Sequence, residues 1–388
     1  MKDEKKAPKL RFKGFTDDWE QVKYGEIFQR RSKMGVSTPA LPSVEYDDIN
    51  PGMGTLNKDP KSKGTSKRGI HFNPGDVLFG KLRPYLKNWL FACFEGVAVG
   101  DFWVLTSSKI DHGFIYSLIQ APGFQYIANL SSGSKMPRSD WGLVSNARTF
   151  IPTNLSEQES ISSVLFGLDT TITLHEEKKR QLERLKSALL QKMFADKSGY
   201  PPVRFEGFSD KWEQVKYGEI FQRRSKMGVS TPTLPSVEYD DINPGMGTLN
   251  KEPKSKGISK RGIYFNPGDV LFGKLRPYLK NWLFACFEGV AVGDFWVLTS
   301  SKIDHGFTYS LIQTPGFQYI ANLSSGSKMP RSDWGLVSNA RTFIPINHLE
   351  QERISSVLFG LDHAITLYEH KLEILNKIKS FLLQNMFI

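Results

Sequence analysis

The sequence predicts an α+β protein with two mixed, strand-rich globular modules separated by two long helices. We expect these helices to pair with each other as a coiled coil. Three observations lead to this prediction. The chain of 388 residues repeats itself at a distance of 193 residues. Each repeat contains short apolar runs bounded by glycine, which are typical of strands. Each repeat also ends in a long segment without proline, whose apolar residues follow a coiled-coil spacing.

The repeat has a nearly invariant part and a divergent part. Residues 19–152 match residues 212–345 at 128 of 134 positions. Residues 157–195 match residues 350–388 at only 25 of 39 positions. Solenoid repeats have periods of about 20–50 residues, so we interpret this longer period as a duplicated domain.

The divergent segments are predicted to be long helices. Asn154 and Glu157 have the spacing of a capping box, and so do Asn347 and Glu350. A helix of this length extends about 58 Å and needs a partner along its surface. We favour the helix of the other copy as that partner. The alternative is that each helix folds back on its own module.

Both helices contain a predicted coiled-coil seam with alternating spacings of four and three. The seam of the second copy is strong, and it consists of Leu361, Ile365, Tyr368, Leu372, Leu375, Lys379, Leu382 and Met386. In the first copy, His175, Lys179 and Lys186 interrupt the same register. We therefore expect the first helix to pair weakly with a second copy of itself.

The modules contain several short predicted elements. Residues 75–80 and residues 96–105 each predict one strand, because both runs are apolar and glycine-bounded. Residues 114–120 predict a short helix. Residues 50–54 and 131–134 have the composition of turns or loops.

These elements divide the chain into four parts. We place the first module at residues 1–155 and the central helix at 156–196. The second module, with its linker, covers 197–348, and the distal helix covers 349–388.

Composition excludes several classes of protein. No stretch approaches the roughly 18 apolar residues of a membrane span, and the N-terminal residues lack the apolar region of a secretory signal. Two cysteines, Cys93 and Cys286, are too few for a disulfide framework, so we expect a cytoplasmic protein. Lys and Arg outnumber Asp and Glu by 51 to 40. This excess favours nucleic acid as a partner, although a dispersed basic surface is the alternative.

No motif in the sequence predicts a catalytic or metal site. The run from Gly75 to Lys81 resembles a phosphate-binding loop, but Leu82 stands where a hydroxyl residue should hold magnesium. The acidic cluster at residues 45–48 has no further ligand at metal-binding spacing. Cys93 lies in an apolar run, which predicts a place in the core rather than a reactive thiol. We therefore expect no catalytic residue, and neither a metal nor a cofactor in this chain.

Basic residues in Gly-, Ser- and Pro-rich segments are the candidate functional residues. Loop Arg and Lys side chains can bind guanine edges or phosphates, while hydroxyls fix the register. For residues 58–68, DNA contact and simple solvation both stay open, whereas for residues 131–138 we favour DNA contact. The candidates in the first copy are Arg30, Arg31, Lys33, Lys63, Lys67, Arg68, Lys81, Arg83, Tyr85, Ser134, Lys135 and Arg138. Those in the second copy are Arg223, Arg224, Lys226, Lys256, Lys260, Arg261, Lys274, Arg276, Tyr278, Ser327, Lys328 and Arg331.

An ordered set of motifs resembles the specificity (S) subunits of type I restriction-modification systems. The set contains the run Pro8-Lys-Leu-Arg-Phe-Lys-Gly-Phe, Trp19, the strand at 75–78 and the Ser131-Ser-Gly-Ser loop. It continues with Glu157-Gln-Glu, Leu168-Asp and Leu189-Leu-Gln-Lys-Met-Phe. The pattern Pro…Glu-Gln…Leu-Asp…Leu-Leu-Gln-x-Met-Phe occurs twice at matching places. The resemblance covers the full chain. Each motif is weak alone, but the duplicated order is specific.

The resemblance implies two target-recognition domains that each read one half of a split DNA site. It also implies that the two long helices pair as an antiparallel coiled coil, which holds the domains apart and gives the chain pseudo-two-fold symmetry. It also implies assembly with two methyltransferase (M) subunits and, for cleavage, two restriction (R) subunits. Those partners use S-adenosylmethionine, ATP and magnesium, whereas this chain should bind none of them. The expected location is the cytoplasm of a bacterium or archaeon.

This chain differs from the usual family pattern, because its two recognition domains are almost identical instead of dissimilar. Two-fold symmetric binding of identical modules requires a palindromic site, so the expected target is bipartite and palindromic. Two other classes stay open. One is a stand-alone, repressor-like DNA-binding protein, and the other is a nucleic-acid enzyme with an unrecognised active site.

Overall fold

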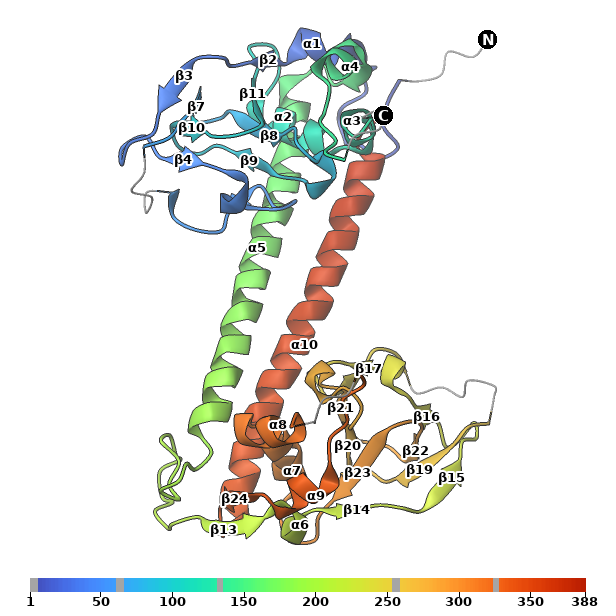
Figure 1. The fold of residues 1–388 in the computed structure, drawn as a ribbon. Coiled ribbons are helices and arrows are strands. Elements are labelled where there is room, and N and C mark those ends of the chain that lie inside the picture. The colour runs from blue at the N-terminus through green and yellow to red at the C-terminus, as the bar shows by residue number, and fades with distance from the viewer. Residues whose placement is uncertain (1–5, 61–65, 131–134, 253–258, 324–327) are drawn as a thin grey trace. The chain divides into compact units, whose positions relative to one another are not determined.

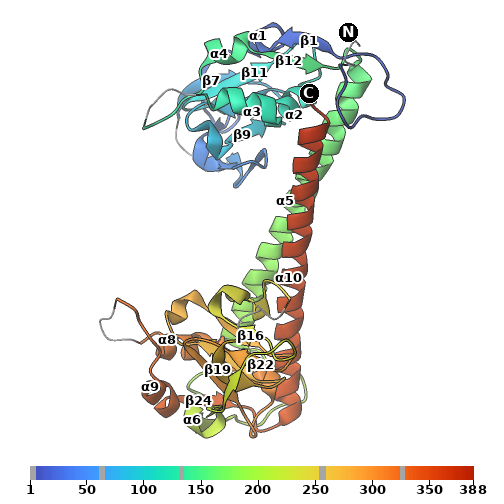
Figure 2. The same cartoon turned by 90° about the vertical axis from the view of Figure 1, so that its right-hand side faces the viewer.

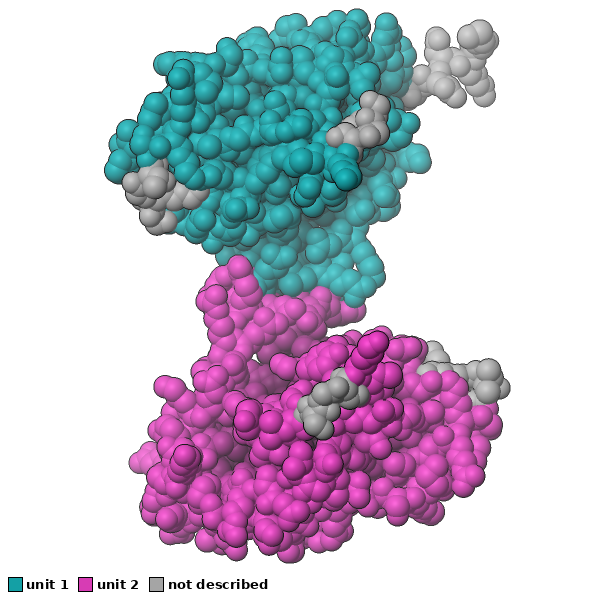
Figure 3. Space-filling model, viewed as in Figure 1, with its two compact units in different colours: residues 1–176, 371–388 teal, residues 177–370 magenta. Residues whose placement is uncertain are grey.

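The computed structural model describes residues 6–60, 66–130, 135–252, 259–323 and 328–388. The chain forms two compact units (Figure 3). Unit 1 contains residues 1–176 and 371–388, and unit 2 contains residues 177–370. Each unit therefore combines one module with a part of both long helices.

Unit 1 is built around two four-stranded sheets among its described residues. One has the order β3 (Met34–Val36), β7 (Arg68–Phe72), β10 (Gly96–Ala98) and β4 (Ser43–Val44). The other has the order β2 (Gln29–Arg30), β11 (Phe102–Thr106), β8 (Val77–Gly80) and β9 (Trp89–Phe91). Two smaller pairs are β1 (Glu20–Lys23) with β12 (Arg148–Ile151) and β5 (Ile49–Asn50) with β6 (Thr55–Leu56). β4 and β10 are parallel, and the other pairs are antiparallel.

The helices of unit 1 are mostly short. They are α1 (Tyr24–Ile27), the 3₁₀ helices η1 (Tyr46–Asp48) and η3 (Pro84–Leu86), α2 (His112–Gln120), α3 (Pro122–Ala128) and α4 (Trp141–Asn146). The side chain of Asp111 caps α2 by accepting from the amide of Phe114. The long helix α5 (Leu155–Lys192) begins in this unit (Figure 1).

Unit 2 has the same internal topology. Its strands are β13 (Glu213–Lys216), β14 (Gln222–Arg223), β15 (Met227–Val229), β16 (Ser236–Val237), β17 (Ile242–Asn243), β18 (Thr248–Leu249), β19 (Arg261–Phe265), β20 (Val270–Gly273), β21 (Trp282–Phe284), β22 (Gly289–Ala291), β23 (Phe295–Thr299) and β24 (Arg341–Ile344). Its helices are α6 (Tyr217–Ile220), η4 (Tyr239–Asp241), η5 (Pro277–Leu279), α7 (His305–Ile312), α8 (Pro315–Ala321), α9 (Trp334–Asn339) and α10 (His348–Asn385).

Two of the local predictions are confirmed and one is wrong. The strand at 75–80 corresponds to β8, and the helix at 114–120 corresponds to α2. The run 96–105 forms two strands instead of one, because the backbone turns at Gly100 with a φ of 108°. A positive φ costs glycine little, so the chain can leave the first sheet there and enter the second.

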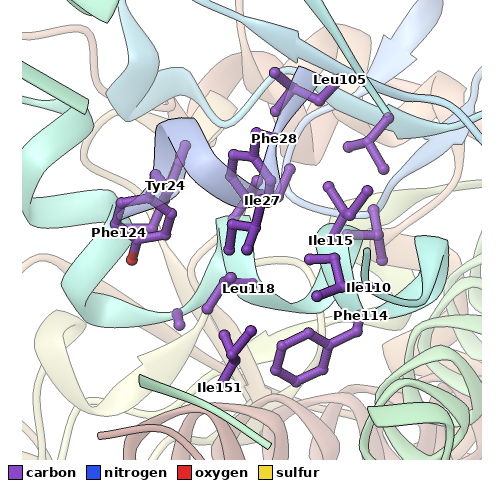
Figure 4. Packing of buried hydrophobic residues seen from close by; sticks show 14 of the residues in the cluster. Tyr24, Ile27, Phe28, Leu105, Ile110, Phe114, Ile115, Leu118, Phe124 and Ile151 are labelled. Atoms are coloured by element: carbon purple, nitrogen blue, oxygen red, sulfur yellow. The ribbon is translucent and has the colours of Figure 1, made fainter. Parts of the chain in front are cut away.

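The main core of unit 1 lies between the second sheet and helices α2 and α3. Phe114 and Phe124 are fully buried, and Tyr24 packs edge-on against Phe124 (Figure 4). Cys93 does not belong to any core. It is exposed, as is Cys286, whereas its neighbour Ala92 is fully buried. The expectation of a buried Cys93 was therefore wrong.

The capping box at the start of α5 is only half formed. Asn154 Oδ1 accepts from the amide of Ser156, as a helix cap should. Glu157 instead accepts from Arg11 at 2.6 and 2.8 Å and lies 3.4 Å from Trp19 Nε1. The carboxylate is nearly fully buried, so the guanidinium supplies the charge that its burial requires. Glu350 forms the same contacts in unit 2.

The predicted antiparallel pairing of the two long helices is confirmed within each unit. In unit 1 the first half of α5 lies beside the last part of α10, with Asp169 and Lys379 in contact (Figures 1 and 2). Ile161 and Leu165 of α5 also enter the core of their own module. The two alternatives weighed from the sequence are thus both realised, because each helix packs against its own module and against the other helix.

The polar residues of the first seam have partners, which the sequence did not reveal. Lys186 forms an ion pair with Asp362, and both side chains are nearly buried. Lys179 lies 2.7 Å from Glu369. These lysines therefore connect the two helices instead of interrupting their contact.

Among the described residues, no helix is both long enough and apolar enough to cross a membrane.

Candidate nucleic-acid interface

Two of the predicted basic segments lie side by side in unit 1. Leu82 and Arg138 form an isolated antiparallel bridge. The amide of Arg83 donates to the carbonyl of Pro137 at 2.7 Å, and the amide of Ser139 donates to the carbonyl of Lys81 at 2.8 Å. Segments more than 50 residues apart in the sequence thus form one basic surface.

Asp101 lies between the cations of this surface. Its carboxylate is 3.6 Å from Lys81 Nζ and 3.1 Å from Arg138 Nη2. The side chain of Arg138 is still 54% exposed, so its guanidinium can reach a ligand while Asp101 orients it. Sequence analysis did not single out Asp101, because an Asp after a glycine is ordinary turn composition.

Tyr46 fixes the base of the same surface. Its hydroxyl donates to the carbonyl of Asp101 at 2.6 Å and accepts from the amide of Leu82 at 3.1 Å. Burial raises the pKa of Tyr46 to about 12, so the hydroxyl keeps its proton to a higher pH than an ordinary tyrosine does. Sequence reasoning did not find this residue, since its role depends on two distant backbone groups.

The turn around η3 has an unusual backbone. Arg83 and Lys87, which flank η3, have φ values of 49° and 58°. Within the described residues, the other non-glycine residues with positive φ are their counterparts Arg276 and Lys280. Such strain costs stability and is often found at functional sites. The turn exposes Tyr85 by 55% between two cations, and Lys87 is an additional basic residue that the sequence prediction missed.

Arg30 is connected to this region through α4. Its guanidinium lies 4.4 Å from the ring centroid of Trp141, the first residue of α4, which follows the Arg138 segment. Trp141 in turn packs edge-on against Trp103 of β11. A stacked guanidinium is held in place at little entropic cost and keeps its donors available.

The other predicted residues of unit 1 either form ion pairs with acidic side chains, are exposed, or lie outside the described residues. Arg31 lies 2.5 Å from the buried carboxylate of Asp76, and Lys67 lies 2.7 Å from Glu45. Both cations therefore have structural partners. The remaining candidates are Lys33, Arg68 and Lys135, which are exposed, and Lys63 and Ser134, which lie outside the described residues.

Unit 2 contains the same arrangement. The carboxylate of Asp294 lies 3.6 Å from Lys274 Nζ and 3.0 Å from Arg331 Nη2. The amide of Arg276 donates to the carbonyl of Pro330. The other candidates have the same surroundings as their counterparts in unit 1. Arg223 stacks on Trp334, Arg224 forms an ion pair with Asp269, and Lys260 forms one with Glu238. Tyr278 is 56% exposed, and Arg261 and Lys328 are exposed as well. Lys256 and Ser327 lie outside the described residues.

The surroundings of Lys226 differ from those of its counterpart Lys33 in unit 1. Lys226 Nζ lies 5.3 Å from the ring centroid of Tyr264, which forms a hydrogen bond with Glu288. In unit 1 the equivalent ring is that of His71, which contacts Glu95.

The groups on this surface are suited to binding phosphates and bases. In the described part of the chain, no group of three His, Cys, Asp or Glu side chains could hold a metal ion. The surface instead offers exposed cations and an exposed tyrosine on a rigid turn, which are groups that bind phosphates and stack on bases.

The comparison with solved structures is the one that identifies the fold. No family model matches the sequence, and no curated protein matches it. The crystal structure of a type I restriction-modification system S subunit from M. genitalium matches with a TM-score of 0.69 at 14% identity, covering 98% of this chain and 99% of that chain.

Two further solved structures match with lower scores. An HsdS subunit from Thermoanaerobacter tengcongensis has a TM-score of 0.40 at 17% identity, covering 94% of this chain and 95% of that one. A structure concerning complex assembly of the type I R-M system has a TM-score of 0.48 at 16% identity, covering 94% and 96%. The fold assignment rests on the M. genitalium structure: this chain has the fold of a type I restriction-modification S subunit, as its duplicated motifs implied.

Proposed function

We propose that this chain is the DNA-recognition subunit of a type I restriction-modification complex and carries out no chemistry itself. The observation that carries the proposal is the basic surface formed by Lys81, Arg83, Tyr85 and Arg138, which recurs in unit 2. One such surface in each module is what recognition of a two-part DNA site requires.

The chemistry of this surface fits duplex DNA. Arg138 can form a bidentate contact with a guanine edge, since Asp101 holds only one side of its guanidinium. Lys81, Arg83 and Lys87 supply charge for phosphates, which fix the position of a protein on the duplex without specifying sequence. Lys135, three residues before Arg138 in the sequence, is also exposed.

We propose further that the target is bipartite and palindromic. Both modules present nearly the same side chains, because 128 of 134 positions are identical. Among the differences, only His71/Tyr264 and Thr65/Ile258 change the side chain near a basic segment, and residues 65 and 258 lie outside the described residues. Two equivalent modules that bind with two-fold symmetry read the same bases on opposite strands.

We also propose that the chain binds two M subunits and two R subunits in the cytoplasm of a bacterium or archaeon. The end of α10 in unit 1 exposes an apolar face made of Ile374, Ile378 and Phe381, whose exposed fractions are 43%, 42% and 56%. Exposed apolar residues at this helical spacing are typical of a surface that a partner helix covers. S-adenosylmethionine, ATP and magnesium would be held by those partners.

The test is a map of adenine methylation in cells that express this chain with a methyltransferase subunit. We expect methylation at a half-site, a non-specific gap and the reverse complement of the half-site. Two unrelated halves would contradict the palindromic target. The purified chain alone should neither methylate nor cleave DNA with any of the three cofactors, since activity of the isolated chain would favour a nucleic-acid enzyme. DNA binding without any association with M subunits would favour a repressor-like protein.

A further inference from the structure

The helix pair contains one nearly buried ion pair in each unit. In unit 1, Lys379 Nζ lies 2.5 Å from Asp169, and the two side chains are 11% and 6% exposed. In unit 2, Lys186 contacts Asp362 with equivalent burial. We call Asp169–Lys379 and Asp362–Lys186 the register pairs, because each joins a defined residue of α5 to a defined residue of α10.

The register pairs are connected to the modules as well as to the helices. The hydroxyl of Tyr116, on α2, donates to Asp169 at 2.9 Å. Lys379 Nζ lies 3.3 Å from the carbonyl of Gly52, in the turn between β5 and β6. The same turn packs so closely that a Cβ on Gly54 would lie 1.9 Å from the Tyr116 hydroxyl. Four segments of unit 1 therefore meet at one charged contact.

The two register pairs are equivalent under the sequence repeat. Asp362 and Lys379 lie 193 residues after Asp169 and Lys186, so each copy contributes one acid and one base. Tyr309 donates to Asp362 in the same way as Tyr116 donates to Asp169. Both units thus specify the same alignment of α5 with α10.

An apolar seam with a seven-residue repeat tolerates displacement by one heptad much better than a buried charge does. Such a displacement would place Ser162 or Glu176 opposite Lys379. If Ser162 lies opposite Lys379, both Lys379 and Asp169 lose their charged partner. If Glu176 lies opposite Lys379, Lys379 gains a new partner, but Asp169 stays beside Tyr116 without a cation. A buried charge without its counter-ion is strongly unfavourable, so both displaced alignments are disfavoured.

The register pairs contribute more to the selection of one alignment of α5 with α10 than to the stability of the helix pair. Burial raises the pKa of Asp169, an effect that the attraction to Lys379 opposes without cancelling. Apolar residues of similar volume would therefore stabilise the contact about as well, but they would not distinguish one alignment from another.

We propose that the register pairs fix the alignment of the helix pair and thereby the spacing between the two DNA half-sites. This inference rests on the proposed function. Asp169, Lys186, Asp362 and Lys379 act as positioning residues, since none of them belongs to the basic surface that would contact DNA. A displacement by one heptad shifts the helices by about 10 Å, which corresponds to about three base pairs.

The experiment uses the full chain and selection from a randomised double-stranded DNA library, which reports half-site sequence and spacer length separately. A charge-conserving variant carries Lys379→Asp and Asp362→Lys, both on α10, which places like charges at both contacts. Its rescue variant adds Asp169→Lys and Lys186→Asp on α5, which restores both ion pairs with reversed polarity.

A neutral variant keeps the test informative if the like-charge variant does not fold. It carries Asp169→Leu, Lys379→Met, Asp362→Leu and Lys186→Met, so no buried charge remains. We expect it to select the same half-sites as the native chain, while its preference for one spacer length falls by about tenfold. The rescue variant should select the single native spacer.

The outcomes separate the two proposals. A native chain that enriches no bipartite site would overturn the proposed function. A native chain with one spacer and a neutral variant with the same half-sites and the same single spacer would overturn the role of the register pairs and leave the proposed function intact. A rescue variant that folds but selects a different or mixed spacer would also overturn it.

Discussion

The ring of Phe387 stacks on the ring of Phe114, with 5.8 Å between their centroids. Phe114 belongs to α2 of the first module, whereas Phe387 follows the helix of the second repeat. Phe194 stacks on Phe307 in unit 2 in the same way, at 5.5 Å. Each module core is therefore completed by the end of the other repeat's helix.

This relationship predicts that Phe387→Ala destabilises unit 1. The side chain is 9% exposed and belongs to the core cluster, so its removal leaves a cavity and should lower the free energy of unfolding by about 3 kcal/mol. Urea denaturation measures the change. Phe381→Ala on the same helix is the control, because that ring is 56% exposed and should change stability by less than about 0.5 kcal/mol. Equal effects of the two substitutions would contradict the prediction.

A chain of residues 1–196 should form a homodimer. It contains Asp169, Lys186 and Phe194, and Asp169 is the repeat equivalent of the Asp362 that Lys186 contacts. Two such chains can form two Lys186–Asp169 contacts and complete each other's cores, although the seam lysines had suggested weak pairing. Analytical ultracentrifugation tests this. Lys186→Asp should shift the mass toward monomer, and a monomeric native segment at micromolar concentration would refute the idea.

Replacement of Lys135, Arg138, Lys328 and Arg331 by Ala should weaken DNA binding without unfolding the protein. These side chains are exposed, so no cavity forms. Each lost base contact costs about 1–3 kcal/mol of binding, and each lost phosphate contact lowers the salt slope by about one.

Titrations at several salt concentrations measure both effects. The matched control replaces Lys109, Lys178, Lys192 and Lys302, which are exposed and carry the same total charge. If both quadruple variants lose the same affinity, the loss reflects net charge, and the assignment of this loop is wrong.

The tyrosine at the base of the basic surface predicts an alkaline effect on stability. Burial raises the pKa of Tyr46 and of Tyr239 from 10.0 to about 12. A raised folded-state pKa contributes stability that is complete below pH 10 and is lost as the pH rises toward 12, by up to about 1.4 kcal/mol per pH unit for each group. The double variant Tyr46→Phe and Tyr239→Phe should lose stability less steeply in this range.

Urea denaturation from pH 8 to pH 11.5 measures this slope. Tyr126→Phe with Tyr319→Phe serves as the control, because both rings are 70% exposed. A slope that changes equally in both double variants would show that the buried tyrosines are not the cause.

The sequence alone determined the helices and strands that depend on interactions between residues close together in the chain. The repeat predicted two modules of one topology, the spacing of apolar residues predicted two long helices that pair with each other, and the glycine-bounded run predicted β8. The cations of the Lys81 and Arg138 segments were also named from the sequence, because loop composition marks them as exposed.

Only the tertiary structure decided which distant groups meet. Glu157 has the spacing of a cap residue, yet it binds Arg11, which is 146 residues away. Lys186 interrupts the apolar seam in the sequence, but the fold pairs it with Asp362. The Lys81 and Arg138 segments become one surface only because backbone hydrogen bonds join them beside Asp101. Local propensity reflects interactions within a few residues, whereas a buried charge is stable only beside a counter-ion that the folded chain brings from elsewhere.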